Sequence, residues 1–366
     1  MANVFDYLSW RGDLSFSAAP FCEADNLILC LLSYLDFSHM VLEGDTVGLP
    51  LEQAAPLYFR LHPPKKGSLG LLLSDEIPEL LSRAAASPRF ARVRLWGHRS
   101  RLDEKRGLQF SATAFSLGCG TDFVAFRGTD DTLVGWKEDF QMAVRCPVPA
   151  QEEARDYLNF VGSHTSGPLL LGGHSKGGNL AVYAAACCRE DVQPRIELVW
   201  NNDGPGFLPD VLKQSGFRSV RDRVRSFIPR SGMVGLILSS DWPIEAVESS
   251  ALGALQHNAL TWQILGRNFV RAQGLSRSSM QADKTFHALL QELTPAQRQQ
   301  VIDDVFSVGD ELGAKTLTDL FTDTRKRDTL RVLAARLTGF DKDTRDSLFR
   351  ALRVALRMDD EDLRGE

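Results

Sequence analysis

The feature that most constrains the fold of this chain is a glycine-framed serine within residues 169–186, LLLGGHSKGGNLAVYAAA. A short apolar run precedes the serine, which is typical of a strand buried on both faces, and a run of small residues follows, which is typical of a helix. Gly173 and Gly177 each stand two positions from Ser175. Because glycine accepts strained dihedrals and leaves room for close backbone contact, this spacing predicts a sharp strand-to-helix turn that presents the Ser175 hydroxyl clear of the sheet.

Strand-like and helix-like patterns alternate around this turn. Strand-like segments occupy residues 92–97, 109–116, 122–126, 168–171, 195–200 and 224–228, and helix-like segments occupy 75–86, 130–143, 151–161 and 178–188. Such alternation predicts right-handed β–α–β crossovers and a parallel sheet. Together with the serine turn, it predicts an α/β-hydrolase-like fold: a doubly wound, mostly parallel sheet with helices on both faces.

The length of the chain predicts a second structural unit. A single core stops growing at about 250–300 residues, and this chain has 366. From residue 275 onward the sequence is polar and helix-like without strand candidates. We therefore predict an α/β-hydrolase domain over 1–274 and a helical C-terminal appendage over 275–366. The residues expected to shape this appendage are Thr294, Pro295 and Gln297, which resemble a capped helix N-terminus, and Leu348, Leu352 and Leu356, which share one helical face.

The charge balance and the cysteines exclude several classes of protein. The chain carries 42 basic and 47 acidic residues, a formal net charge of −5, which argues against a nucleic-acid partner. Its six cysteines show no CxxC or metal-ligand spacing, so we expect reduced thiols, no metal and no cofactor.

Nothing in the sequence predicts export or insertion into a membrane. The opening MANVFDYLSWRGDLSF lacks the basic and apolar regions of a secretory signal. The apolar stretch over 27–35 is far shorter than the ~20 residues that a membrane-spanning helix needs. We therefore expect a cytoplasmic protein without stable membrane insertion.

The serine turn needs a base before it can do chemistry, because a serine hydroxyl is a weak nucleophile at neutral pH. In α/β-hydrolases the triad follows the chain order serine, acid, histidine. Only His257 and His287 follow Ser175. His287 falls in the expected appendage, whereas His257 follows a loop-like stretch after the last strand candidate, so we predict His257 as the general base.

The acid of the triad stays open between two residues. The carboxylates between the serine and the histidine include Asp191, Asp203, Asp210, Asp222, Asp241, Glu245 and Glu248. Asp203 directly follows the strand-like RIELVW, where a Gly-Pro-Gly turn would project it from the carboxyl edge of the sheet. Asp241 follows the later strand, the more usual place for this role.

An oxyanion hole is expected from two backbone N–H groups. Residues 123–136 read as a strand, a loop and a helix, and Thr129 in that loop offers its N–H and a hydroxyl. The N–H of Lys176, at the start of the helix after the serine, would lie beside it.

The segment 232–252, rich in apolar residues, would form either a lid or acyl-binding wall, or part of the core.

Several of these motifs together resemble known families. FVAFRGTDD with Trp136 and Asp139, followed by GGHSKGGNLA, resembles class 3 lipases. FDYLSWRGDLSF, NDGPGF and the segment SxxGxLQHNxxxW look more closely like a bacterial family of lipase-like hydrolases, the Mbeg-like proteins. The resemblance implies Ser175 as nucleophile, His257 as base, and Thr129 with Lys176 at the oxyanion hole.

The chain departs from the class 3 lipases in one respect. Those enzymes place their acid just after the strand that here reads SFIPRSGMVG, and this segment contains no carboxylate. Either Asp203 or Asp241 serves instead, or the triad is incomplete.

The sequence therefore predicts a serine hydrolase that cleaves a carboxylic ester or a related acyl compound, with a small-molecule acyl or lipid-like substrate. Two alternatives remain at this point. One is an acyltransferase, in which an alcohol or amine replaces water. The other is a non-catalytic binding module that keeps the hydrolase fold.

Overall fold

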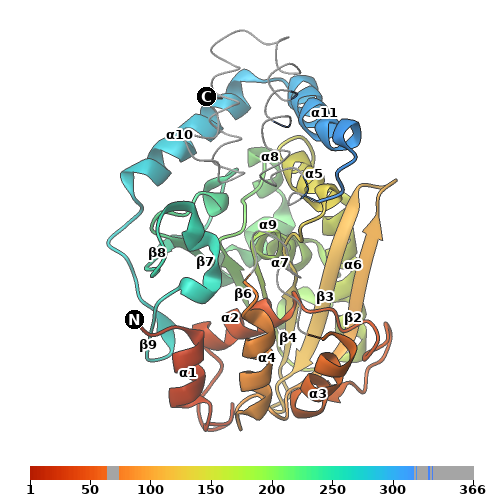
Figure 1. Cartoon of the computed structure of the whole chain (residues 1–366), viewed down its shortest axis with the longest axis vertical. Coiled ribbons are helices and arrows are strands. Elements are labelled where there is room, and N and C mark those ends of the chain that lie inside the picture. Colours follow the sequence, from red (N-terminus) through yellow and green to blue (C-terminus); the bar gives the residue numbers. More distant parts are fainter. Residues whose placement is uncertain (64–73, 317–318, 320–328, 330–331, 333–366) are drawn as a thin grey trace.

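The computed structural model describes residues 1–63, 74–316, 319, 329 and 332 (Figure 1). Its centre is an eight-stranded sheet in which the strands lie in chain order from β1 to β8. The strands are β1 Leu49–Pro50, β2 Arg94–Asp103, β3 Leu108–Ser116, β4 Asp122–Phe126, β5 Leu169–His174, β6 Ile196–Asn202, β7 Val224–Pro229 and β8 Ile244–Val247. Neighbours from β1 to β4 pair antiparallel, and neighbours from β4 to β8 pair parallel. The serine turn lies within the parallel half.

Helices cover both faces of this sheet (Figure 1). The helices are α1 Val4–Arg11, α2 Glu23–Leu32, α3 Leu51–Leu61, α4 Ile77–Ala86, α5 Leu133–Gln141, α6 Pro149–His164, α7 Lys176–Cys187, α8 Pro209–Leu212, α9 Ser215–Val220, α10 Arg277–Glu292 and α11 Pro295–Leu312. A small ladder, β9 Ile264–Leu265 with β10 Asn268–Phe269, follows the sheet.

Successive residues of the parallel strands pack into different cores. Phe123 and Leu170 belong to the core that includes α1 to α4, whereas their neighbours Val124 and Leu171 belong to the core that includes α6, α7 and α9. Side chains of a strand alternate between the two faces of its sheet, so both faces of these strands are buried. The expected α/β fold with a mostly parallel sheet and helices on both faces is confirmed.

The expectation of a doubly wound sheet was wrong. Each new parallel strand from β4 to β8 is added on the same side of the previous one. Right-handed crossovers that advance in one direction place their helices on one face, and α6, α7 and α9 do share one core. The opposite face is covered by helices that precede the parallel strands in the chain. Alternating patterns reveal crossovers but not the direction in which the sheet grows.

The sequence also missed the last parallel strand, β8. Ile244 is exposed, the next two residues are partly buried and only Val247 reaches the core, so the apolar alternation is weak. Within the segment 232–252, Leu238 and Trp242 are buried in the same core as α7. The structure thus packs this part of the segment into the core.

The two helices that begin the expected appendage pack against the sheet-bearing part of the molecule. Thr294 and Gln297 form the predicted capping box at the start of α11: Thr294 N donates to Gln297 Oε1 at 3.0 Å, and Gln297 N donates to Thr294 Oγ1 at 3.3 Å. Phe306 of α11 then packs on Phe140 of α5, with ring centroids 5.5 Å apart. The domain boundary at 274/275 stays a prediction, and Leu348, Leu352 and Leu356 lie outside the described residues.

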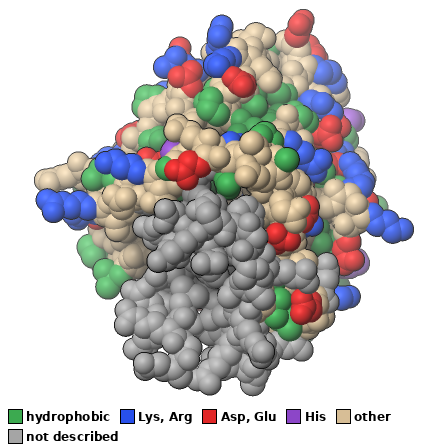
Figure 2. Space-filling view, turned by 90° about the horizontal axis from the view of Figure 1, so that it is seen from above, with side chains coloured by type: hydrophobic (Ala, Val, Ile, Leu, Met, Phe, Trp, Pro, Cys, Tyr) green, Lys and Arg blue, Asp and Glu red, His purple; other side chains and the backbone are tan. Residues whose placement is uncertain are grey.

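On the face seen in Figure 2, basic and acidic side chains are interspersed. Among the described residues, none of the helices combines the length and the apolar character required to cross a bilayer.

A buried ion pair anchors the N-terminal helices. Arg89, after α4, donates from Nε and Nη2 to the two carboxylate oxygens of Asp25 in α2, at 2.7 and 2.5 Å. Both side chains are excluded from solvent. The same guanidinium donates from Nη1 to the carbonyl oxygens of Leu14 and Ala19, and Tyr7 of α1 donates to Asp25. One charged pair therefore holds α1, the following loop and α2 together.

Substituting Asp25→Asn should destabilise the protein strongly, because it leaves a buried guanidinium without its counter-charge. We expect a loss of about 3–5 kcal/mol in the free energy of unfolding, measured by urea denaturation. The matched control is Glu79→Gln, which breaks the half-exposed pair with Arg83 and should change stability by about 1 kcal/mol or less. Equal losses in the two variants would contradict the anchoring role.

Candidate active site

Ser175 occupies the sharp bend that the sequence predicts, between β5 and α7. Its dihedrals are φ 57° and ψ −135°, which a residue with a side chain rarely adopts. The flanking glycines are required by space: a Cβ on Gly173 would lie 2.1 Å from the backbone of Gly177, and a Cβ on Gly177 would lie 2.0 Å from the carbonyl oxygen of Phe126. The bend is therefore packed tightly against its own helix and against the end of β4.

Asp203 lies at the end of the neighbouring strand, in an equivalent position. β5 and β6 pair in parallel with His174 opposite Asn202, so Ser175 and Asp203 each follow the last paired residue of their strand. Asp203 also has a positive φ, of 54°, and its side chain is fully buried. Its Oδ2 lies 2.7 Å from His257 Nδ1, and its Oδ1 accepts from Gly235 N at 2.9 Å. The carboxylate is thus fixed on both oxygens and orients the histidine.

His257 ends a short 3₁₀ turn, Gly253–His257, and is 8% exposed. Its backbone is bound to the residue before the serine: His174 Nε2 donates to the carbonyl oxygen of His257 at 2.8 Å. A carbonyl only accepts, so His174 carries a proton on Nε2, and in the neutral ring Nδ1 accepts from the hydroxyl of Tyr34 at 3.0 Å. The rings of His174 and His257 lie 4.7 Å apart. His257 is therefore held beside the serine turn.

The loop between β4 and α5 lies against the same turn. A Cβ on Gly128 would lie 2.6 Å from the carbonyl oxygen of His174 and 2.1 Å from the hydroxyl of Tyr34. The next residue, Thr129, donates its hydroxyl to Asp139 Oδ2. The hydroxyl hydrogen of Thr129 is therefore engaged by Asp139. Lys176 is the first residue of α7, so its N–H lies at the positive end of that helix.

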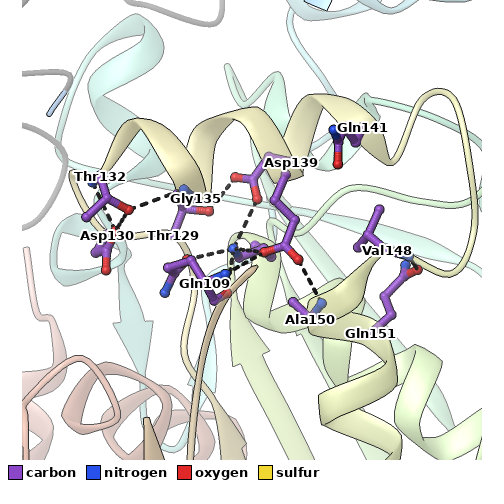
Figure 3. A network of polar contacts seen from close by, with 12 residues as sticks. Gln109, Thr129, Asp130, Thr132, Gly135, Asp139, Gln141, Val148, Ala150 and Gln151 are labelled. Carbon is purple, nitrogen blue, oxygen red and sulfur yellow. Dashed lines mark hydrogen bonds and ion pairs between the residues drawn. The ribbon is translucent and has the colours of Figure 1, made fainter. Parts of the chain in front are cut away.

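The side chain of Lys176 is buried in a polar network, of which Figure 3 labels Gln109, Thr129 and Asp139. Its Nζ donates to Gln109 Oε1 at 2.6 Å and to Glu138 Oε2 at 3.2 Å, and lies 3.4 Å from Asp139 Oδ1. Burial acts to lower the pKa of Lys176, but the carboxylates of Asp139 and Glu138 more than offset it, and the pKa lies above its ordinary value. Burial raises the pKa of Asp139 to about 6, although Lys176 and Thr129 oppose the shift.

The structure thus brings together five of the residues that the sequence singled out: Ser175, His257, Asp203, Thr129 and Lys176. Of the two acids left open, Asp203 contacts His257, whereas Asp241 is half exposed with its Oδ2 3.5 Å from Arg221 Nη1. The other histidine, His287, lies on α10 beside Asp283, 2.9 Å away. Among the described residues, no group of His, Cys, Asp or Glu side chains is arranged to hold a metal ion.

Sequence reasoning missed the residues that support this site. Tyr34 follows α2 and carried no signal, because its partner His174 is far away in the chain. Glu138 and Gln109 were also missed, and the Lys176 side chain was overlooked because only its backbone N–H was considered. Asp139 belongs to the lipase-like motif, which predicts no role for it.

A match to the Mbeg1-like family covers residues 84–307, well over half of the chain. The chain belongs to the Mbeg1-like family. The matched region contains Thr129, Ser175, Asp203 and His257, and the Mbeg1-like match begins within α4, after Tyr34. No protein with a curated description and no solved structure matches the chain. The resemblance to class 3 lipases stays a prediction drawn from the motifs.

The tight packing around the glycines of the bend predicts that two glycine-to-alanine variants lose different amounts of stability. Gly173→Ala should lose about 3 kcal/mol in the free energy of unfolding, because its methyl group would overlap backbone that has no room to move. The control is Gly118→Ala, which also adds a methyl group but has open space around a φ of +78°. There we expect a loss of about 1–2 kcal/mol from the backbone conformation alone. Thermal and urea denaturation would measure both, and equal losses would contradict the packing argument.

Proposed function

We propose that this Mbeg1-like protein is a serine hydrolase of α/β-hydrolase fold, and that it cleaves a carboxylic ester or a related acyl compound. The observation that carries the proposal is the setting of Ser175: a strained bend, with an Asp203-bound histidine tethered to the residue before it. A serine, a histidine and a carboxylate in this arrangement are what nucleophilic acyl chemistry requires, in whatever fold they occur.

The reaction would proceed in two steps through an acyl-enzyme. The Ser175 hydroxyl adds to the carbonyl carbon while His257 Nε2 takes its proton, since Nδ1 faces Asp203. The N–H groups of Thr129 and Lys176 stabilise the oxygen that becomes negative. His257 then returns the proton to the departing alcohol, and water, activated by the same imidazole, releases the acid and restores Ser175.

The position of the acid supports a complete triad despite the departure from the class 3 pattern. The segment after β7 supplies no carboxylate, but Asp203 at the end of β6 reaches the same histidine. The acid can move from the end of β7 to the end of β6 because β6 lies between β7 and β5, the strand that carries the serine.

The surroundings of His257 favour an apolar acyl group. The same 3₁₀ turn and the residue before it carry two exposed leucines, Leu252 and Leu255, which are 82% and 59% exposed. Large apolar side chains exposed together beside a catalytic histidine would contact the acyl chain of a substrate.

Labelling with a fluorophosphonate tests the nucleophile directly. The wild type should react covalently at one serine and hydrolyse nitrophenyl esters, and Ser175→Ala should do neither. Peptide mass spectrometry locates the label, and a series of esters from short to long chain gives the acyl preference. Equal labelling of both proteins would remove Ser175 from the site. An unlabelled wild type without turnover would instead favour a binding module that retains the fold.

The two candidate acids are separated by a pair of matched variants. Asp203→Asn should lower ester turnover by about 10³–10⁴-fold, because an amide no longer holds His257 in the orientation and tautomer that accept the proton. Asp241→Asn, at a half-exposed position away from the histidine, should leave turnover unchanged. Turnover at saturating ester is the measurement, with denaturation curves confirming that both variants fold. A larger loss in Asp241→Asn would reverse the assignment.

A further inference from the structure

We propose that the ammonium group of Lys176 is a buried clamp that positions the Thr129 loop against the serine bend, so that the two backbone donors of the oxyanion hole face the same point. The inference rests on the proposed function for its chemical purpose, but the clamp itself is a property of the fold. Lys176 would thus act twice: its N–H contacts the substrate, and its side chain is a positioning group.

The contacts join three separate elements at one nitrogen (Figure 3). Lys176 Nζ comes from the start of α7, Gln109 from β3, and Glu138 from α5. Gln109 offers both its side-chain and its backbone oxygen, at 2.6 and 3.0 Å. Glu138 is itself fixed by backbone, since Oε1 accepts from Ala150 N at 2.7 Å and Oε2 from Gln109 N at 3.1 Å. The ammonium therefore has a rigid cradle.

Asp139 extends the clamp to the oxyanion loop. One carboxylate oxygen lies 3.4 Å from Lys176 Nζ, and the other accepts the hydroxyl of Thr129. A continuous path of charged and polar contacts thus leads from one proposed donor residue to the other. If the ammonium is removed, the carboxylate that holds Thr129 loses its nearest cation.

An apolar side chain at position 176 would fill the same space without the cost of burying a charge. Lys176 and Glu138 are both completely excluded from solvent, and removing charges from water costs several kcal/mol per ion. A buried ion cluster is therefore weak evidence of stability. What a lysine adds over a methionine of similar size is a fixed charge that binds α5 and β3 in one geometry, which suits a positioning role.

The clamp should weaken as the pH falls, because Asp139 must be ionised to attract Lys176. The charged and titratable groups around it are Lys176, Glu138, Asp130, Tyr34 and Arg127. With the pKa of Asp139 raised to about 6, the carboxylate is present at neutral pH and is protonated as the pH drops through that value. The protonated form no longer pairs with the ammonium, and its own proton competes with the Thr129 hydroxyl.

Hydrogen exchange tests the clamp without any requirement for turnover. In Lys176→Met, backbone amides of residues 127–141 should exchange at least about tenfold faster than in the wild type. The control is Glu79→Gln, which breaks the half-exposed pair with Arg83 on α4 and should leave that exchange unchanged. Unchanged exchange in Lys176→Met would overturn the clamp, even if Ser175 proves to be the nucleophile.

A milder variant gives the chemical readout, because Lys176→Met could fold poorly with two unpaired carboxylates. In Asp139→Asn, we expect fluorophosphonate to label Ser175 about 10- to 100-fold more slowly at pH 7.5, as expected for a misplaced donor. Below about pH 6 the wild-type labelling rate should fall relative to that of Asp139→Asn, because only the wild type has an Asp139 carboxylate that can be protonated.

The two proposals fail in different ways. A wild type that fluorophosphonate never labels refutes the hydrolase, while the exchange of residues 127–141 still decides the clamp. Identical labelling rates and identical pH profiles in the wild type and Asp139→Asn refute the positioning role, while labelling of Ser175 upholds the hydrolase.

Discussion

The strained bend at Ser175 is the constraint on which the rest of the site depends. Holding a residue with a side chain at such dihedrals costs on the order of 1–3 kcal/mol, so the surrounding structure must leave no alternative. Here the bend is enclosed by backbone. Gly177 lies against the carbonyl of Phe126, Gly204 lies against the carbonyl of Ser175, and Ser175 N donates to Asn202 O at 3.0 Å. The parallel register of β4, β5 and β6 thus fixes the position of one hydroxyl.

The same register explains why the acid comes from β6. Since β5 and β6 end side by side, the residue after each strand emerges at the same edge of the sheet, and both residues adopt a positive φ. His257 arrives from a loop far along the chain, and the geometry of that loop depends on the contact between its carbonyl and His174. Tyr34, which lies in the core that includes α1 to α4, completes this contact and so ties the N-terminal helices to the site.

Local features of the molecule could be predicted from sequence, and long-range pairings could not. The bend at Ser175 was predictable because glycine spacing, an apolar strand and a small-residue helix all lie within one short segment. The choice between Asp203 and Asp241 could not be predicted, because it depends on which strand end lies beside the loop that carries His257. The direction of sheet growth was missed for the same reason. β8 was missed because a short, half-exposed edge strand carries little hydrophobic pattern.

Lys176 illustrates a further limit of sequence reasoning, because position alone suggested a backbone role and hid an electrostatic one. Two carboxylates, Glu138 and Asp139, lie behind a site where the proposed reaction develops negative charge. Unopposed, they would disfavour that charge, since interactions between like charges are strong where water is excluded. The ammonium between them offsets this field and also supplies the geometry that aligns Thr129. A neutral side chain could fill the space but could do neither, which gives a physical reason for a lysine immediately after the nucleophile.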